Sequence, residues 1–385
     1  MPNRRQRATS EGGESSAALR AHDDGAWSST PRAGWATGGA GLRPDPLRIL
    51  MVAPVWLRVP PHRYGGIEWV VHWLCKGLAA RGHKVTLVAS GDSACPVSIR
   101  SAFAQPPPGS FESHVPEVVH SLEAMDAAEE LRPDVIHDHS LTASLGLGGQ
   151  SPLVLTAHLS RDGDRGEAYR RLSGRARLVA ISEAQRASMP EVRWGGVVHN
   201  AVEVSSFPFR ADKEDFLVFL GRISRDKGAH LAVEAARRAG MRILLAGRIG
   251  LEDERRYWEQ EVVPRAGSDL EYVGEADAAM KRDLLSRARA LVFPICWDEP
   301  FGLVMAESLA CGTPVVAFRR GAVPEIVDDG LTGFVVDDLD GLAAALGAID
   351  RIDPMLCRKA AESRFDLPRM VEGYERIYLE SSGRR

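Results

Sequence analysis

The sequence predicts an α/β fold of two doubly wound, Rossmann-like domains that face each other across a cleft. Short apolar runs of strand length alternate with helical segments along most of the chain, which is typical of parallel sheets covered by helices on both faces. The chain has 385 residues, enough for two domains of ordinary size. The alternation breaks once, near residues 200–215, and then starts again.

The first series begins at the apolar run 48–53. A helix is expected over 66–81, because Val70, Val71, Leu74 and Leu78 share one face. Gly82 follows as a favoured C-terminal cap. Further strands are expected at 84–89, 135–137, 153–156 and 177–181.

The second series begins after the Phe207-Pro208-Phe209 break, which is typical of an interdomain linker. Its elements are expected at 216–220 (strand), 229–239 (helix), 242–246 (strand), 253–265 (helix), 271–273 (short strand), 278–287 (helix), 290–294 (strand) and 314–317 (strand). We place the domains at 46–207 and 208–362, with a C-terminal helical segment over 363–385.

Composition excludes several classes of protein. The chain is 44% hydrophobic and 26% charged with a net charge of −4, so nothing draws it as a whole to nucleic acid or anionic membranes. It lacks an apolar run of about 18 residues, so no transmembrane helix is expected. The five scattered cysteines form no CxxC pair, which argues against disulfides or zinc and favours a reducing cytoplasm.

Residues 1–45 differ from the rest of the chain. They are rich in Gly, Ala, Ser, Arg and Pro and poor in Ile, Val and Leu. Such a segment buries too little apolar surface to offset its ordering entropy, and it has no apolar core of a signal peptide. We expect a disordered tail; the alternative is a translation start placed too early.

Glu299 and Glu307 form the most informative pair, two carboxylates separated by seven residues. An apolar strand-like run precedes them, and the pattern becomes helical after Gly302. The unpaired N–H groups of that helix start attract phosphate, and flanking carboxylates can accept hydrogen bonds from sugar hydroxyls. The segment is therefore suited to a nucleotide-sugar; the alternative is a chance pair on an exposed helix.

Two glycine-containing loops also follow predicted strands. Gly221 to Gly228 carries Arg222 and Lys227, two cations that can hold a diphosphate; the alternative is a basic surface turn. Gly65-Gly66 opens the 66–81 helix, which suits a phosphate or a sugar pressed against backbone, although such a pair is often only a turn.

Together these motifs resemble glycosyltransferase family 4, retaining enzymes of the GT-B fold. The resemblance covers residues 47–380 and includes the Glu-x7-Glu pair, the Gly-Arg…Lys-Gly loop and the Gly-Gly-x-Glu helix start. The block Trp297 to Gly302 is similar to bacterial members that glucosylate small molecules. The chain departs from the family at Ala201 and Glu203, where Gly and Asp are usual, so a hinge role there is not implied.

The resemblance implies specific roles. Arg222 and Lys227 would hold the donor diphosphate, Glu299 would bind sugar hydroxyls, and His158, at a strand end, would lie against the donor sugar. These four are the expected catalytic residues. The expected donor-binding residues are Gly65, Gly66, Gly221, Phe301, Gly302, Leu303 and Glu307, the last of which would bind the ribose.

His137 and His139 point to one face of a strand, which would suit a metal; the resemblance implies none, because the chemistry of this fold needs no metal.

The resemblance also implies that the last helix, about 366–381, crosses back onto the first domain. First-domain loops 56–64, 91–115 and 159–170 would shape the acceptor site.

The expected activity is transfer of a hexose, glucose being favoured, from a nucleoside diphosphate sugar to an unknown acceptor hydroxyl. A UDP-sugar is the favoured donor, and no cofactor is expected. The acceptor is a small molecule, a sugar or a lipid, with at most peripheral membrane contact and no nucleic acid. The alternatives are a nucleotide-sugar epimerase and a non-catalytic nucleotide-sugar-binding protein on the same fold.

Overall fold

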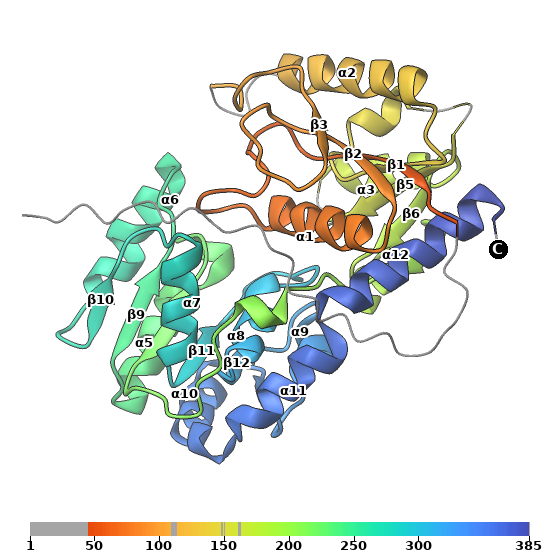
Figure 1. Cartoon of the computed structure of the whole chain (residues 1–385). Coiled ribbons are helices and arrows are strands. Elements are labelled where there is room, and N and C mark those ends of the chain that lie inside the picture. Colours follow the sequence, from red (N-terminus) through yellow and green to blue (C-terminus); the bar gives the residue numbers. More distant parts are fainter. Residues whose placement is uncertain (1–44, 109–113, 148, 150, 161–162, 385) are drawn as a thin grey trace, which may run out of the picture. The chain divides into compact units, whose positions relative to one another are not determined.

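Two parallel β-sheets organise residues 45–385 in the computed structural model (Figure 1). The structure describes residues 45–108, 114–147, 149, 151–160 and 163–384. The expected tail lies outside the described residues, apart from Asp45. Two doubly wound sheets confirm the predicted fold class.

The first sheet has the strand order β3-β2-β1-β4-β5-β6-β7, and all its neighbouring strands are parallel. Its direction of winding reverses between β1 and β4, and ligands of such sheets bind at the carboxyl ends of the strands beside that reversal. The strands are β1 (Arg48–Val52), β2 (Lys84–Val88), β3 (Ser98–Arg100), β4 (Val135–Asp138), β5 (Leu153–Ala157), β6 (Arg177–Ala180) and β7 (Trp194–Val197).

Both faces of this sheet are buried, because successive side chains of a strand point to opposite faces. Ile49 and Met51 of β1 pack into one apolar cluster with helix α1, whereas Leu50 and Val52 pack into a second cluster on the other face. The helices of this half are α1 (Gly66–Ala80), α2 (Val115–Leu131), α3 (Arg165–Leu172) and α4 (Glu183–Ser188).

The second sheet has the order β10-β9-β8-β11-β12-β13 and reverses its winding between β8 and β11. Its strands are β8 (Leu217–Leu220), β9 (Ile243–Ala246), β10 (Leu270–Tyr272), β11 (Ala290–Phe293), β12 (Val315–Phe318) and β13 (Gly333–Val336). Its helices are α5 (Ala229–Ala239), α6 (Glu252–Tyr257), α7 (Ala278–Arg287), α8 (Leu303–Ala310), α9 (Val323–Ile326), α10 (Leu339–Gly347) and α11 (Pro354–Arg364).

The last helix, α12 (Leu367–Ser382), packs against α1 of the first half. Its Glu375 accepts hydrogen bonds from Arg81 at 2.6 Å and from His83 at 2.9 Å. Burial alone would raise the pKa of Glu375, but the hydrogen bonds from His83 and Arg81 outweigh it and hold the pKa below its ordinary value. A partly buried charged cluster therefore ties the C-terminal helix to the first sheet.

The expected helix over 253–265 is wrong in its type and extent. The α-helix ends at Tyr257, a π-helical turn covers Trp258–Val262, and a 3-10 turn covers Val263–Arg265. Pro264 has no N–H to continue the α-helical ladder.

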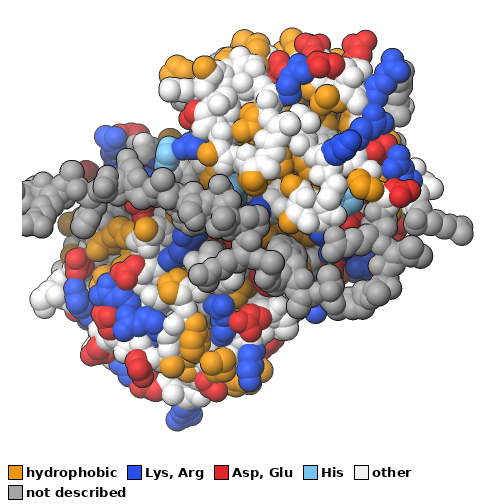
Figure 2. Space-filling view, in the orientation of Figure 1, with side chains coloured by type: hydrophobic (Ala, Val, Ile, Leu, Met, Phe, Trp, Pro, Cys, Tyr) orange, Lys and Arg blue, Asp and Glu red, His pale blue; other side chains and the backbone are white. Residues whose placement is uncertain are grey.

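Helix α2 had no counterpart in the expected elements, and the expected loops 91–115 and 159–170 contain β3 and the start of α3. Val115, Val118, Leu122 and Met125 of α2 are exposed, and hydrophobic side chains gather over this helix in Figure 2. Within the described part of the chain, none of the helices is long and apolar enough to cross a membrane.

Candidate functional site

A pocket of about 340 Å³ lies at the carboxyl ends of strands from both sheets. All eleven site residues expected from the sequence line it: Gly65, Gly66, His158, Gly221, Arg222, Lys227, Glu299, Phe301, Gly302, Leu303 and Glu307. Segments more than 150 residues apart in the sequence therefore converge on one cavity, as the winding of the two sheets requires.

The start of helix α8 faces this pocket. Gly302 adopts φ +79°, and a Cβ there would lie 2.6 Å from the Met305 side chain and 3.3 Å from that of Glu299. The left-handed turn lets the chain pass from the Glu299 loop into the helix without a clash. Unpaired N–H groups at the first turn of α8 give the pocket a partial positive charge.

Lys227 and Glu299 form an ion pair inside the pocket, with Nζ 2.5 Å from Oε2. Their side chains are only 17% and 12% exposed. The ammonium also lies 4.9 Å from the centre of the Trp297 ring. One of the two expected diphosphate cations is thus paired with the carboxylate expected to bind the sugar.

Glu307, on α8, is buried and forms an ion pair with Lys281 of α7. Lys281 lines the pocket and lies 5.9 Å from the centre of the Trp69 ring. The sequence analysis missed Lys281 and Trp69, because neither stands in a loop after a strand. The one available signal for Trp69 was its place in the first turn of the helix that follows Gly65-Gly66, and Lys281 had no such signal.

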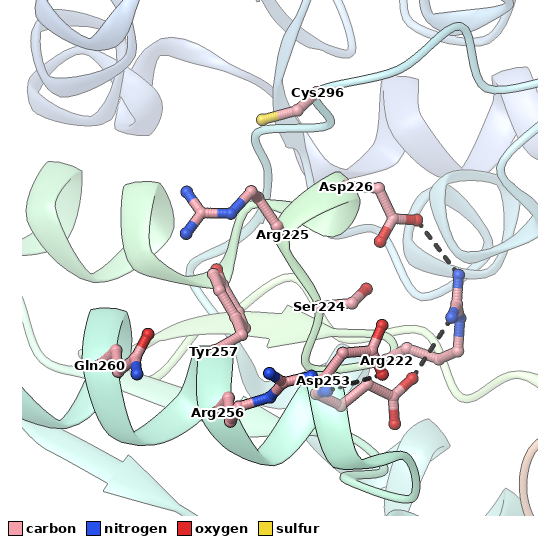
Figure 3. A pocket seen from close by; sticks show the side chains of 10 residues that line it. Arg222, Ser224, Arg225, Asp226, Asp253, Arg256, Tyr257, Gln260 and Cys296 are labelled. Atoms are coloured by element: carbon pink, nitrogen blue, oxygen red, sulfur yellow. Dashed lines mark hydrogen bonds and ion pairs between the residues drawn. The ribbon is translucent and has the colours of Figure 1, made fainter.

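The Arg222 side chain is held by carboxylates of its own half of the chain. Its guanidinium donates to Glu254 at 3.3 Å and to Asp226 at 3.1 Å. Figure 3 shows Arg222 among residues that line a second pocket, of about 740 Å³. Arg222 lines both pockets, so its guanidinium lies at the boundary between them.

The first half contributes the start of α1 to the site. The backbone N–H of Tyr64 donates to Glu275 of the second half at 3.3 Å, and Arg248 lies 5.2 Å from the centre of the Tyr64 ring. Glu68, in the first turn of α1, is buried, and burial raises its pKa to about 7. This side of the pocket therefore combines the Tyr64 ring with the charged side chains of Arg63, Arg248 and Glu275.

The loops expected to shape an acceptor site contribute unequally. Arg63, Tyr64 and Leu159 line the pocket, whereas none of the described residues of 91–115 does. Trp56 instead donates its indole N–H to Glu117 of α2 at 2.9 Å.

His158 lines the pocket from the end of β5, and its Nε2 lies 2.7 Å from Nδ1 of His139. Burial lowers the pKa of His158 to about 3, so the ring is neutral at physiological pH. Across the described ranges, 45–384 with their gaps, no group of three or more His, Cys, Asp or Glu side chains could hold a metal ion.

Comparison with known proteins assigns the two halves separately. The family described as Glycosyltransferase Family 4 matches residues 64–206, and the family described as Glycosyl transferases group 1 matches residues 203–352. These two ranges include all eleven pocket residues named above.

Relatives of known function match over most of their length. A glycogen synthase of Mycobacterium tuberculosis is 27% identical, over 86% of this chain and 94% of that protein. A phosphatidyl-myo-inositol mannosyltransferase of Mycolicibacterium smegmatis is 28% identical, over 88% of this chain and 95% of the relative.

The crystal structure of AviGT4, a glycosyltransferase involved in avilamycin A biosynthesis, matches with a TM-score of 0.67 and 26% identity, over 88% of this chain and 98% of that one. The two family matches, the relatives and this structural likeness agree. The chain belongs to glycosyltransferase family 4, and it is a glycosyltransferase of the GT-B fold.

Proposed function

We propose that the chain transfers a hexose from a nucleoside diphosphate sugar to an acceptor hydroxyl with retention at the anomeric carbon. UDP-glucose is the proposed donor, on the resemblance of the Trp297–Gly302 block. One observation carries the proposal: Lys227, Glu299, Glu307 and the start of α8 surround a single pocket.

In the proposed mechanism, departure of the diphosphate dominates the barrier. Its negative charge grows beside Lys227, Arg222 and the first N–H groups of α8. Fixed charges in a closed, dry site are the strongest way to stabilise such a leaving group. The diphosphate would replace Glu299 as the partner of Lys227, and the freed carboxylate would accept hydrogen bonds from the hexose.

Retention is proposed to arise by departure and attack on one face of the sugar, with the acceptor proton passing to the leaving phosphate. His158 is neutral and lines the pocket, so in this proposal it supplies a hydrogen bond to the sugar without adding charge. Closure of the two halves would exclude water and suppress hydrolysis of the donor.

The acceptor is proposed to be a small molecule, a sugar or a lipid bound beside Tyr64 and Leu159. The reaction is proposed to run without a metal. Cytoplasmic action is proposed because the five cysteines, which are all free thiols, suit a reducing compartment. An epimerase or a non-catalytic binder is not favoured, because the relatives above are named as a synthase and a transferase.

The test is a thermal shift screen with UDP-glucose, GDP-mannose and ADP-glucose at equal concentrations. A donor at about 100 times its Kd stabilises the folded protein by about 2.7 kcal/mol, so the true donor raises the melting temperature and the others do not. NMR of the transfer product then reports the anomeric configuration. Stabilisation by GDP-mannose alone would replace the proposed donor, inversion would overturn the mechanism, and isomerisation of donor alone would indicate an epimerase.

A further inference from the structure

A buried polar cluster connects the candidate donor pocket to the C-terminal helix. His137 lies on β4, His139 directly follows it, and Thr156 lies on β5 just before His158. Nδ1 of His139 lies 2.7 Å from Nε2 of His158. On the other side, His137 bonds Thr156 at 2.7 Å through Nε2 and Tyr378 of α12 at 2.6 Å through Nδ1.

All three histidines are neutral. Burial lowers the pKa of His158 to about 3, and burial lowers the pKa values of His137 and His139 well below the ordinary range. Each ring therefore carries one proton, and the nitrogen that carries it is set by the hydrogen bonds of the ring. The tautomer of His158 is thus a property of its neighbours.

The bond between His139 and His158 needs one proton, which either ring can supply. If His158 donated from Nε2, His139 would carry its own proton on Nε2. That atom is buried and has no hydrogen-bond partner among the described residues. A buried N–H without an acceptor is rare in folded proteins, whereas an unused acceptor is better tolerated. His139 therefore holds its proton on Nδ1 and donates it to His158.

We propose that His139 is a positioning residue for the transfer reaction: by donating to Nε2 of His158, it fixes the proton of His158 on Nδ1. The neutral His158, which lines the pocket, then keeps one N–H, on Nδ1, as the donor available to a ligand oxygen. Its only lone pair is engaged by His139, so His158 cannot act as a general base. This deepens the proposed function and rests on it for its kinetic part.

The orientation of His139 is fixed largely by packing, since its second nitrogen has no hydrogen-bond partner in the part of the chain that the structure describes. Its ring centre lies 4.0 Å from that of His137. His137 is itself held between Thr156 and Tyr378, and Thr156 also bonds the Tyr374 hydroxyl at 2.8 Å. Two tyrosines of α12 therefore support, through His137, the ring that sets the tautomer of His158.

The decisive measurement is the tautomer itself. Protein labelled with ¹⁵N only in histidine gives ring-nitrogen shifts in long-range ¹H–¹⁵N spectra, which separate Nδ1–H from Nε2–H rings. The chain has 11 histidines, and the His158 signals are those that disappear in His158→Gln. The expected result for the unmodified protein is a neutral His158 with its proton on Nδ1. A proton on Nε2 would overturn the proposal.

Two substitutions test the link to activity. In His139→Asn the amide nitrogen lies near the place of Nδ1 and can still donate, whereas His139→Leu cannot. We expect His139→Leu to lose the single tautomer of His158 and to lower kcat/KM by roughly tenfold or more, as for other orienting hydrogen bonds. His139→Asn should keep the tautomer and restore most of that activity.

The outcomes test the positioning role of His139 and the proposed hexose transfer separately. Equal activity of the Leu variant and the unmodified protein, with the tautomer lost, would refute the positioning role. If His139→Leu does not fold, as judged by its melting temperature, the tautomer of the unmodified protein and the Asn variant still decide. The NMR measurement needs no substrate. An absence of hexose transfer would therefore refute the proposed function without affecting the tautomer assigned to His158.

Discussion

Replacing Lys227 with alanine should abolish most of the proposed activity. The Lys227 side chain is 17% exposed, and its ammonium lies against Glu299 and the Trp297 ring, so water cannot readily take its place. Loss of one preorganised group of this kind costs a factor of roughly 10² to 10³ in rate, or about 2.7–4 kcal/mol of transition-state stabilisation. Most of the loss should fall on kcat, because the charge of the diphosphate grows as it leaves.

The assay is steady-state transfer from the donor found in the thermal screen, with Lys359→Ala as the matched control, since Lys359 is an exposed lysine on α11. Lys227→Ala also leaves the Glu299 carboxylate buried without its counterion, which should lower the melting temperature. Adding Glu299→Gln should recover that stability but not the activity. A kcat/KM for Lys227→Ala within about threefold of the unmodified value would refute the assignment, since one lost charge should cost far more.

Three further changes test the fold and its ionisation. Glu375→Gln should destabilise the fold by about 1–3 kcal/mol at pH 7. Because the pKa of Glu375 in the folded protein lies below its ordinary value, the difference in stability between the variant and the unmodified protein should shrink as pH falls below about 4.5. Thermal melts from pH 7 to 3.5 measure this difference. The hydrogen bond from Cys75 lowers the pKa of Cys95 to about 6. The rate at which iodoacetamide alkylates Cys95, followed by peptide mass spectrometry, should therefore be half-maximal near pH 6. A rate that still rises above pH 8 would contradict this. Gly321→Ala should lower both melting temperature and kcat/KM, because Gly321 has φ +50° and a Cβ there would lie 2.3 Å from the backbone oxygen of Glu299. Gly330→Ala, with φ +74° and open space around it, is the matched control and should affect stability alone.

The elements that the sequence predicted well are those whose apolar faces are buried. Helices α5 and α7 were expected at the residues where they occur, and α1 differs by one residue at its end. Helix α2 was missed because much of its apolar face, including Val118 and Leu122, is exposed and does not mark a core. Strand β7 contains Gly195 and Gly196, which have low strand propensity.

The site was predictable to the extent that its residues follow strands. In a parallel sheet the loops that follow the strands meet at the same edge, however far apart they are in the sequence. Arg222, Lys227 and Glu299 could therefore be placed in one pocket from the sequence alone. Lys281 could not, because its contact with Glu307 depends on how α7 passes α8. The hydrogen bond between His139 and His158 could not be predicted from the sequence either, since it depends on the register of β4 and β5.

Three of the cations that line the pocket are paired with carboxylates of the protein, and this bears on how a donor would bind. Lys227 is paired with Glu299, Lys281 with Glu307, and Arg222 with Asp226 on the far side of its loop. A diphosphate sugar can replace the carboxylate at Lys227 with phosphate oxygens and offer that carboxylate hydroxyl groups in return. Inorganic phosphate can make only the first exchange and would leave the partly buried Glu299 unpaired, which is costly. On the proposed function, the carboxylates that pair with Lys227 and Lys281 therefore select ligands that carry phosphate and sugar together.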